Sequence, residues 1–372
     1  MNVVDIWIVC GGVSTEHDIS ILSAKNVCKG LQDAGYTTHV VVVTQAGEWL
    51  YLSPEVDFKA VTNIEQTLAE SAEPLMLVPG SGSIGTLVRS PGERLPCDCV
   101  FPLVHGTQGE DGVLQGVLQL CGVPYVGCGV MSSAICMSKH VAKVLLEAQG
   151  ISTAPGVVVR SSALHAPDFS DLQERFGLPL FVKPSSQGSS VGISRVSTEE
   201  DYLEALENAF LYDDVVLVEK AIHGRELECS VLGDLTPRVS LPGEVISGAD
   251  FYSFENKYVN DHSVVVTPAD LTDEQVESIQ EAAISVYRAL YCTGMARVDF
   301  FLQEDGNIIV NEINTIPGFT DISMYPKNWA VSGLDSSTLL HSLIESALYC
   351  FQQREDKVTF FKLPSPSEQE VM

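Results

Sequence analysis

Short apolar runs alternate with helical stretches along the first third of the chain. Residues 3–10, 39–44 and 99–105 are β-rich, and residues 20–34 and 113–121 have the apolar spacing of amphipathic helices. Strands that alternate with helices predict an α/β fold with a parallel sheet. A passage rich in glycine, proline and serine predicts a loop around weak strands at residues 79–96.

The pattern changes after Pro155, where the apolar runs become shorter. We expect strands at 156–160, 180–183, 192–196, 215–220 and 225–232, and helices at 138–149, 199–209, 272–290 and 335–353. A length of 372 residues suits two or three domains.

Two β runs that meet at Asp305-Gly306 predict a hairpin over residues 295–314. This dipeptide between apolar runs is a strong signal for a two-residue turn, which would pair Glu304 with Asn307. The same register, continued along the strands, aligns four polar residues as two cross-strand pairs: Asp299 with Glu312, and Arg297 with Asn314.

The pair of acids in this hairpin indicates a metal site. Two carboxylates side by side on paired strands repel each other, and a sheet normally avoids them. A divalent cation removes the conflict, and carboxylate and amide oxygens suit Mg²⁺. The hairpin therefore predicts a magnesium site at Asp299, Glu312 and Asn314, with a solvated polar face as the alternative.

Residues 181–194 form a glycine- and serine-rich loop between two β runs. Glycines let backbone amides approach phosphate oxygens, and Ser189 and Ser190 add hydroxyl donors. Lys183 precedes the glycines, so the segment is not a P-loop, and no GxGxxG motif supports a dinucleotide site. We interpret the segment as a phosphate-binding loop; a flexible linker is the alternative.

The β run at 215–222 becomes polar at Glu219 and Lys220, and Glu226 follows. Backbone groups beside an acid at a strand end can hydrogen-bond an adenine edge, and a second acid can hold a ribose. An ordinary strand end would look the same.

Charge and cysteine content exclude several classes of function. There are 49 Asp and Glu against 21 Lys and Arg, a formal net charge of -28. Binding to nucleic acid or to an anionic membrane requires clustered Lys and Arg, so we expect neither partner. The N-terminus has no basic region before its apolar run, and the ten cysteines form no CxxC pair. These features predict a cytoplasmic protein with reduced thiols.

The phosphate loop, the polar strand end and the acidic hairpin together resemble the ATP-grasp carboxylate–amine ligases. Segments 11–20, 105–112, 124–127 and 314–326 narrow the resemblance to the D-alanine:D-alanine ligase family, over roughly residues 4–350. The resemblance implies an N-terminal Rossmann-like parallel-sheet domain followed by a two-part ATP-grasp fold. The implied domains are residues 1–130 (N-terminal), 131–220 (central subdomain) and 221–372 (C-terminal subdomain with hairpin and lid loop).

Each site residue receives a role from this resemblance. For the amino acids, Glu16 would hold the ammonium of the first D-alanine, and His105 would contact either the substrate or only the backbone. Arg297 and the Gly318 amide would stabilise the oxyanion. Ser323 and the Met324 amide would bind the carboxylate of the second D-alanine. For ATP, Lys139, Lys183, Ser189 and Ser190 would contact phosphates, and Glu219, Lys220, Ile222 and Glu226 would line the adenosine pocket. Ser189 would also join Glu16 and Tyr258 in a triad. Tyr258 and Lys257 would belong to the lid at 247–263, and Lys257 would also bind the nucleotide. Asp299, Glu312 and Asn314 would bind two Mg²⁺, with Mn²⁺ as an alternative metal.

The implied reaction joins two D-alanines through an acyl phosphate, releases ADP and phosphate, and supplies peptidoglycan synthesis. The implied partners are D-alanine, ATP and a second copy of the chain in a homodimer. Tyr258 favours an amine acceptor. A D-Ala:D-Ser or D-Ala:D-Lac ligase is the alternative within the fold, and a non-catalytic nucleotide-binding module is the alternative outside enzymes.

Overall fold

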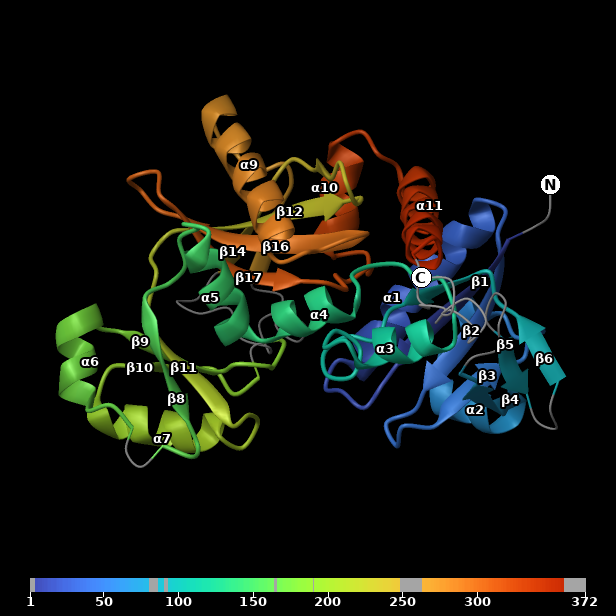
Figure 1. The fold of residues 1–372 in the computed structure, drawn as a ribbon, viewed down its shortest axis with the longest axis horizontal. Coiled ribbons are helices and arrows are strands. Elements are labelled where there is room, and N and C mark those ends of the chain that lie inside the picture. Colours follow the sequence, from blue (N-terminus) through green and yellow to red (C-terminus); the bar gives the residue numbers. More distant parts are fainter. Residues whose placement is uncertain are drawn as a thin grey trace, which may run out of the picture.

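The computed structural model describes residues 4–79, 86–89, 93–163, 166–189, 191–247 and 263–357. Its strands form three sheets: in Figure 1 the first lies at the right, the second at the lower left, and the third above and between them. None of the helices in these ranges has the length and apolar character that crossing a membrane requires.

The first sheet has the strand order β6-β5-β4-β3-β2-β1-β7. Its parallel part is confirmed: β1 (Asp5–Gly11) pairs in parallel with β2 (Thr37–Val43) and with β7 (Cys99–Pro102). The remaining strands pair antiparallel, so the sheet is mixed rather than wholly parallel. These strands are β3 (Trp49–Leu52), β4 (Ala72–Leu77), β5 (Thr86–Arg89) and β6 (Glu93–Pro96).

Helices cover both faces of this first sheet. Helix α1 (His17–Asp33) buries Ile21, Val27 and Leu31 against one face, and α3 (Val113–Leu120) packs in the other core cluster. Short α2 (Ile64–Ser71) and the 3-10 turn η1 (Phe58–Ala60) complete this region.

The second sheet has the order β10-β9-β11-β8 and is antiparallel. Its strands are β8 (Gly156–Arg160), β9 (Leu180–Pro184), β10 (Ser194–Val196) and β11 (Val215–Lys220). Helices α6 (Phe169–Phe176) and α7 (Glu199–Ala209) bury Leu172, Tyr202 and Leu206 against it. Helices α4 (Val130–Met137) and α5 (Lys139–Ala148) link the first sheet to this one.

The third sheet has the order β15-β14-β12-β16-β17, with β13 (Arg238–Val239) beside β12. Its strands are β12 (Arg225–Leu232), β14 (Gly243–Ser247), β15 (Ser263–Val266), β16 (Met295–Leu302) and β17 (Ile308–Asn314). Alternate residues of β12 and β16 pack against α9 (Asp273–Ala289), and the residues between them face the other side.

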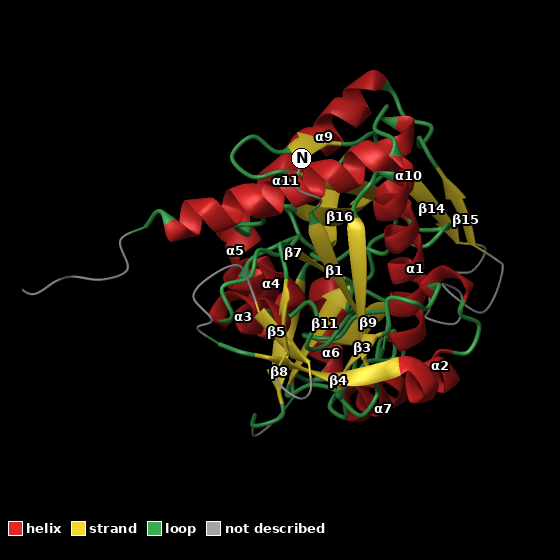
Figure 2. Ribbon diagram, turned by 90° about the vertical axis from the view of Figure 1, so that its right-hand side faces the viewer, coloured by secondary structure: helices red, strands yellow, loops and turns green. Residues whose placement is uncertain are grey.

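The last two helices return toward the first sheet. Helix α10 (Met324–Val331) and helix α11 (Ser336–Glu355) contribute Trp329, Leu340 and Leu343 to the same core cluster as β1 and α1. Figure 2 shows α9, α10 and α11 gathered on one side of the molecule, with α6 and α7 on the opposite side.

Candidate active site

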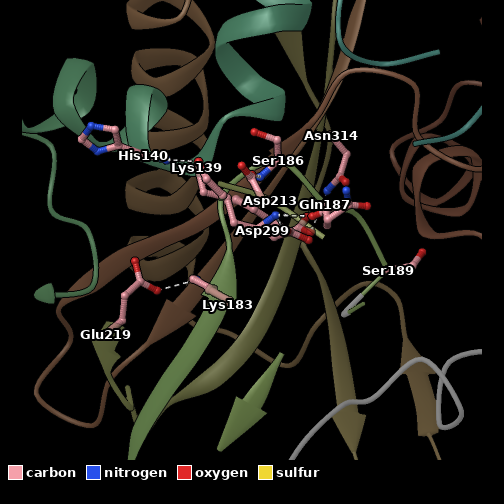
Figure 3. A network of polar contacts seen from close by, with 12 residues as sticks. Lys139, His140, Lys183, Ser186, Gln187, Ser189, Asp213, Glu219, Asp299 and Asn314 are labelled. Carbon is pink, nitrogen blue, oxygen red and sulfur yellow. Dashed lines mark hydrogen bonds and ion pairs between the residues drawn. The ribbon is translucent and has the colours of Figure 1, made fainter. Parts of the chain in front are cut away.

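The predicted cross-strand pairs of the hairpin are confirmed. In the pairing of β16 with β17, Asp299 lies opposite Glu312 and Arg297 lies opposite Asn314. Figure 3 shows Asp299 and Asn314 projecting from these strands into the same space. Four polar side chains therefore share one face of the third sheet.

The predicted turn, in contrast, is wrong. Gln303 donates its N–H to the carbonyl of Asn307, so three residues rather than two form the loop, and Gly306 takes a left-handed φ of 85°. A bulge beyond Asp299, where the register shifts, adds one residue to β17 and restores the predicted pairing of the acids. The two local differences cancel at the site.

The acidic pair fits a divalent metal that is shared with phosphate. Asp299, Glu312 and Asn314 place oxygen atoms on one face, which suits Mg²⁺. In the described part of the chain, no three His, Cys, Asp or Glu side chains cluster so as to hold a metal. Phosphate or water oxygens would therefore have to complete the coordination.

Cationic side chains balance these carboxylates. Arg297 donates from Nε and Nη2 to the two oxygens of Asp299, each at 2.7 Å, and its Nε lies 2.9 Å from Glu228 Oε2. Burial alone would lower the pKa of Arg297, but the two carboxylates outweigh it and hold the pKa well above its usual range. Lys139 Nζ lies 3.7 Å from Glu312 Oε2.

Two lysines meet one buried acid at the end of β11. Lys183 Nζ is 2.5 Å from Glu219 Oε2, and Lys143 Nζ contacts Glu219 Oε1 and the Ala154 carbonyl. Figure 3 shows the ammonium of Lys183 directed at this carboxylate. Burial would raise the pKa of Glu219, but the two ammonium groups hold it below its usual value. Glu219 is therefore ionised, and each of its two carboxylate oxygens contacts one lysine ammonium.

Residues 185–187, at the start of the predicted phosphate loop, are held by contacts with neighbouring segments. The Ser186 N–H donates to Asp213 Oδ2 at 2.6 Å, and Lys139 Nζ donates to the Gln187 carbonyl at 2.6 Å. The Ser185 N–H donates to the carbonyl of Val215 at 2.8 Å. Figure 3 places Asp213 beside Ser186 and Gln187. Hydrogen bonds to neighbouring segments thus fix the backbone at the first residues of the loop.

Glu16 and Ser189 join the phosphate loop to the first sheet's region. The Ser189 hydroxyl donates to Glu16 Oε1, although the two residues lie far apart in sequence. His105 lies beside them, with Nδ1 3.0 Å from the Ile316 carbonyl. Burial lowers the pKa of His105, so its imidazole is neutral at pH 7.

The residues predicted for the second carboxylate lie at the start of α10. Ser323 is the N-cap of this helix, and Met324 is its first residue. The first amides of a helix lack internal partners and can bind an anion. Gly318 packs closely against this serine: a Cβ at Gly318 would lie 2.7 Å from the Ser323 hydroxyl, so a side chain there would have to displace it.

Glu110 connects two loops and lines the same cavity as Gly318 and Ser323. Its Oε2 accepts the Gly106 N–H at 2.7 Å, and its Oε1 accepts the Ile316 N–H at 3.1 Å. Burial, and secondly the nearby charge of Glu16, raise the pKa of Glu110 to about 8. A carboxyl that can change its charge near neutral pH therefore lines the same cavity as the predicted substrate groups.

Two cavities adjoin along this face. The larger has about 1120 Å³ of empty volume, including its open mouth. It is lined by Lys139, Lys183, Glu219, Lys220, Ile222, Glu226 and Asp299 among others. The other, of about 910 Å³, is lined by Glu16, His105, Ser189, Arg297, Asn314, Gly318, Ser323 and Met324 among others. Glu228 and Glu312 border both cavities.

Three of the predicted site residues lie outside the described residues. They are Ser190, Lys257 and Tyr258, and most of the predicted lid at 247–263 falls there too.

Sequence reasoning missed four side chains that the structure places around the site. Lys143 follows Lys139 by one helical turn, and this four-residue spacing was the available signal. Glu228 follows Glu226 by two residues, the spacing of one strand face. Glu110 and Asp213 each accept one backbone N–H from a distant segment, at Ile316 and Ser186, and no spacing in the sequence indicates these two contacts.

Comparisons with known proteins give one consistent result. A family model described as D-ala D-ala ligase N-terminus matches residues 5–128, and one described as D-ala D-ala ligase C-terminus matches residues 145–345. A D-alanine–D-alanine ligase A of Chromobacterium violaceum is 45% identical over 355 residues, covering 94% of this chain and 96% of the relative. A D-alanine–D-alanine ligase of Coxiella burnetii is 42% identical and covers 97% and 98%.

Solved structures agree with these sequence relatives. The D-alanine-D-alanine ligase structure from Coxiella burnetii has a TM-score of 0.86 and 41% identity, covering 95% of this chain and 97% of that one. The VanG D-Ala:D-Ser ligase of Enterococcus faecalis has a TM-score of 0.80 and 33% identity, covering 93% and 100%.

Proposed function

Because the chain belongs to the D-alanine–D-alanine ligase family, we propose that it joins two D-alanines into D-alanyl-D-alanine while converting ATP to ADP and phosphate. The dipeptide is a precursor of peptidoglycan. The observation that carries this proposal is the pair of adjoining cavities, one lined by lysines and the other by Arg297 and helix-end groups. An ATP-dependent ligase needs this arrangement because the phosphoryl group must pass from the nucleotide to a carboxylate.

In the first step, a carboxylate oxygen of the first D-alanine attacks the γ-phosphorus of ATP, and the bond to ADP breaks. Glu16 holds the substrate ammonium, while Lys139 and Lys183 hold the phosphates. Asp299, Glu312 and Asn314 would hold Mg²⁺, which neutralises the phosphate charge when bound. Two such ions, as the resemblance implies, would have to share these three ligands with phosphate oxygens.

In the second step, the amine of the second D-alanine, having lost a proton, attacks the carbonyl carbon of the acyl phosphate. The tetrahedral adduct carries an oxyanion, which Arg297 and the Gly318 amide stabilise. The adduct then collapses, the carbon–oxygen bond to phosphate breaks, and phosphate leaves. Ser323 and the Met324 amide hold the second carboxylate throughout.

The nucleotide base would occupy the far end of the larger cavity. Lys220, Ile222 and Glu226 line it there together with Phe181 and Phe300. Apolar walls with a few polar groups suit a purine. Lys257 and Tyr258 would close over the site as parts of the lid; Tyr258 and Ser189 would complete the triad with Glu16, and Ser190 would add a phosphate contact.

We infer that the acceptor is D-alanine rather than D-serine. Val245, Val265 and Ile322 line the cavity that contains Ser323 and Met324. A methyl group packs well on such walls, whereas a serine hydroxyl that loses water there must find a new partner.

One assay tests the function. ADP release and dipeptide mass are measured with D-alanine alone and then with D-serine or D-lactate added. We expect ADP and D-alanyl-D-alanine with D-alanine alone, and loss of both in EDTA with recovery in Mg²⁺. No ADP release with D-alanine as sole amino acid would refute the proposal, and a preference for a mixed product would favour the alternative acceptor.

Two structural proposals accompany this function. The domain limits are residues 1–130, 131–220 and 221–372, which place one sheet in each part, although α11 packs on the first. Assembly as a homodimer is checked by sedimentation of the purified chain.

A further inference from the structure

Three acidic residues form a row across three neighbouring strands, and one of them has no role in the reaction described above. Glu228 on β12 lies opposite Asp299 on β16, which lies opposite Glu312 on β17. Leu227 and Cys229 are buried in the core beneath the sheet. Because side chains alternate along a strand, Glu228 faces the same side as the two acids of the hairpin.

Arg297 lies between two members of this row. Asp299 accepts two hydrogen bonds from the guanidinium, each at 2.7 Å, and Glu228 Oε2 lies 2.9 Å from Nε. All three side chains are mostly buried, so each charge depends on the others for compensation. The guanidinium is held along one edge by carboxylates.

The two carboxylates that hold Arg297 differ in what else they must do. In the proposed function, Asp299 is a metal ligand, and an oxygen bound to Mg²⁺ attracts a guanidinium less strongly. Glu228 lies on β12, outside the hairpin that carries the three proposed metal ligands. The ion pair between Glu228 and Arg297 therefore remains when Asp299 binds the metal.

We propose that Glu228 is the positioning residue of Arg297, holding its guanidinium against the reacting carbonyl while Asp299 serves the metal. This inference rests on the proposed function. It also explains why Glu228 borders both cavities: its partner Arg297 must lie where the acyl phosphate formed beside the nucleotide meets the amine. An acid in that place would repel phosphate unless a cation were bound to it.

The test compares Glu228→Gln with the parent enzyme in Mg²⁺. Glutamine keeps the shape and one acceptor but loses the charge that holds the guanidinium. We expect kcat to fall about 10- to 100-fold, because oxyanion stabilisation is weakened. A phosphinate analogue of the tetrahedral adduct should bind at least about tenfold more weakly. The Kd of a non-hydrolysable Mg-ATP analogue should change by less than about threefold, because Arg297 acts after nucleotide binding.

Glu244→Gln is the matched control. Glu244 accepts two hydrogen bonds from Arg225, at 2.8 and 2.6 Å, in the same sheet, and it lines neither of the two cavities. We expect its kcat and analogue affinity to stay within about twofold of the parent, because no proposed substrate group contacts it.

Three results would overturn the inference. They are an unchanged analogue affinity in Glu228→Gln, a loss confined to Mg-ATP binding, and an equal loss in Glu244→Gln. If the glutamine variant does not fold, Glu228→Asp gives the same comparison, since it keeps the charge but withdraws it by one methylene. A parent enzyme that makes no dipeptide would instead refute the proposed function, so the two failures are distinguishable.

Discussion

Replacing Lys143 with methionine tests how the two lysines share Glu219. In the parent, this carboxylate contacts Lys143 through one oxygen and Lys183, at 2.5 Å, through the other. Methionine retains most of the buried stem and removes the charge and the hydrogen-bond donors of the ammonium. Lys183 then becomes the sole cation on Glu219, although the proposed function also requires it on the ATP phosphates.

The expected loss of stability follows from these contacts. Removing one partner of a buried ion pair costs about 3–5 kcal/mol when the remaining charge is left alone. Here Lys183 still compensates Glu219, while the Ala154 carbonyl loses a charged donor. We therefore expect a loss of about 2–3 kcal/mol. Glu219→Gln added to Lys143→Met should recover part of it, because the amide needs no cation.

The KM for ATP shows whether Lys143 matters because it shares Glu219 with Lys183 or only because it stabilises the fold. Binding of ATP to the variant must draw Lys183 away from a carboxylate that has no second cation. We expect the KM for ATP to rise about 5- to 30-fold, equivalent to about 1–2 kcal/mol, with kcat less affected. Urea unfolding measures the stability, and ADP release at varied ATP measures the KM.

Lys29→Met is the control for this experiment. Lys29 is exposed on α1 and lines neither of the two cavities, so its loss should alter neither quantity. A KM for ATP within about twofold of the parent in Lys143→Met, at reduced stability, would refute the reasoning, because Lys183 would then not depend on its neighbour.

Three further predictions concern other parts of the site. Asp299→Asn should abolish Mg²⁺-dependent ADP release, because it removes a charge from the proposed metal site; retained turnover would contradict the assignment. Glu110 has a folded-state pKa of about 8 against an ordinary value of 4.5, so the folded protein binds a proton that the unfolded chain lacks between these values. Stability should therefore fall as pH rises from about 4.5 to 8, and urea titrations of Glu110→Gln should lack that part of the fall; an identical slope in parent and variant would count against it. Asp213→Ala should raise the KM for ATP several-fold by releasing the Ser186 N–H, whereas Asp214→Ala, which loses a bond to an exposed serine hydroxyl, should not. Equal KM values in these two variants would show that the loop does not need this anchor.

Much of the fold could be predicted from the sequence because it depends on local patterns. Strands such as 215–220 and helices such as 199–209 have clear apolar periods, and Thr198 caps the latter through its side chain as expected. The antiparallel strands β3 and β4 were missed, because they are short and their pairing depends on strands elsewhere in the sheet.

The residues of the site likewise fall into those that local spacing predicts and those that it does not. Residues within one hairpin could be aligned because their spacing is fixed by the strand period, and the alignment survived an incorrect turn only because a bulge compensated for it. Contacts such as Glu16 with Ser189 or Glu110 with Ile316 join distant segments. No period in the sequence encodes such contacts, and only the assembled fold shows them.

The position of α11 has a consequence for how the protein is made. Leu339, Leu340 and Leu343 fill the same core as β1 and α1, although the ribosome adds them long after the first sheet has emerged. Until then, the newly made sheet exposes the apolar surface that this helix later covers. The helix that covers this face is made last, so we expect the nascent chain to expose part of the first sheet's apolar surface until α11 has been translated.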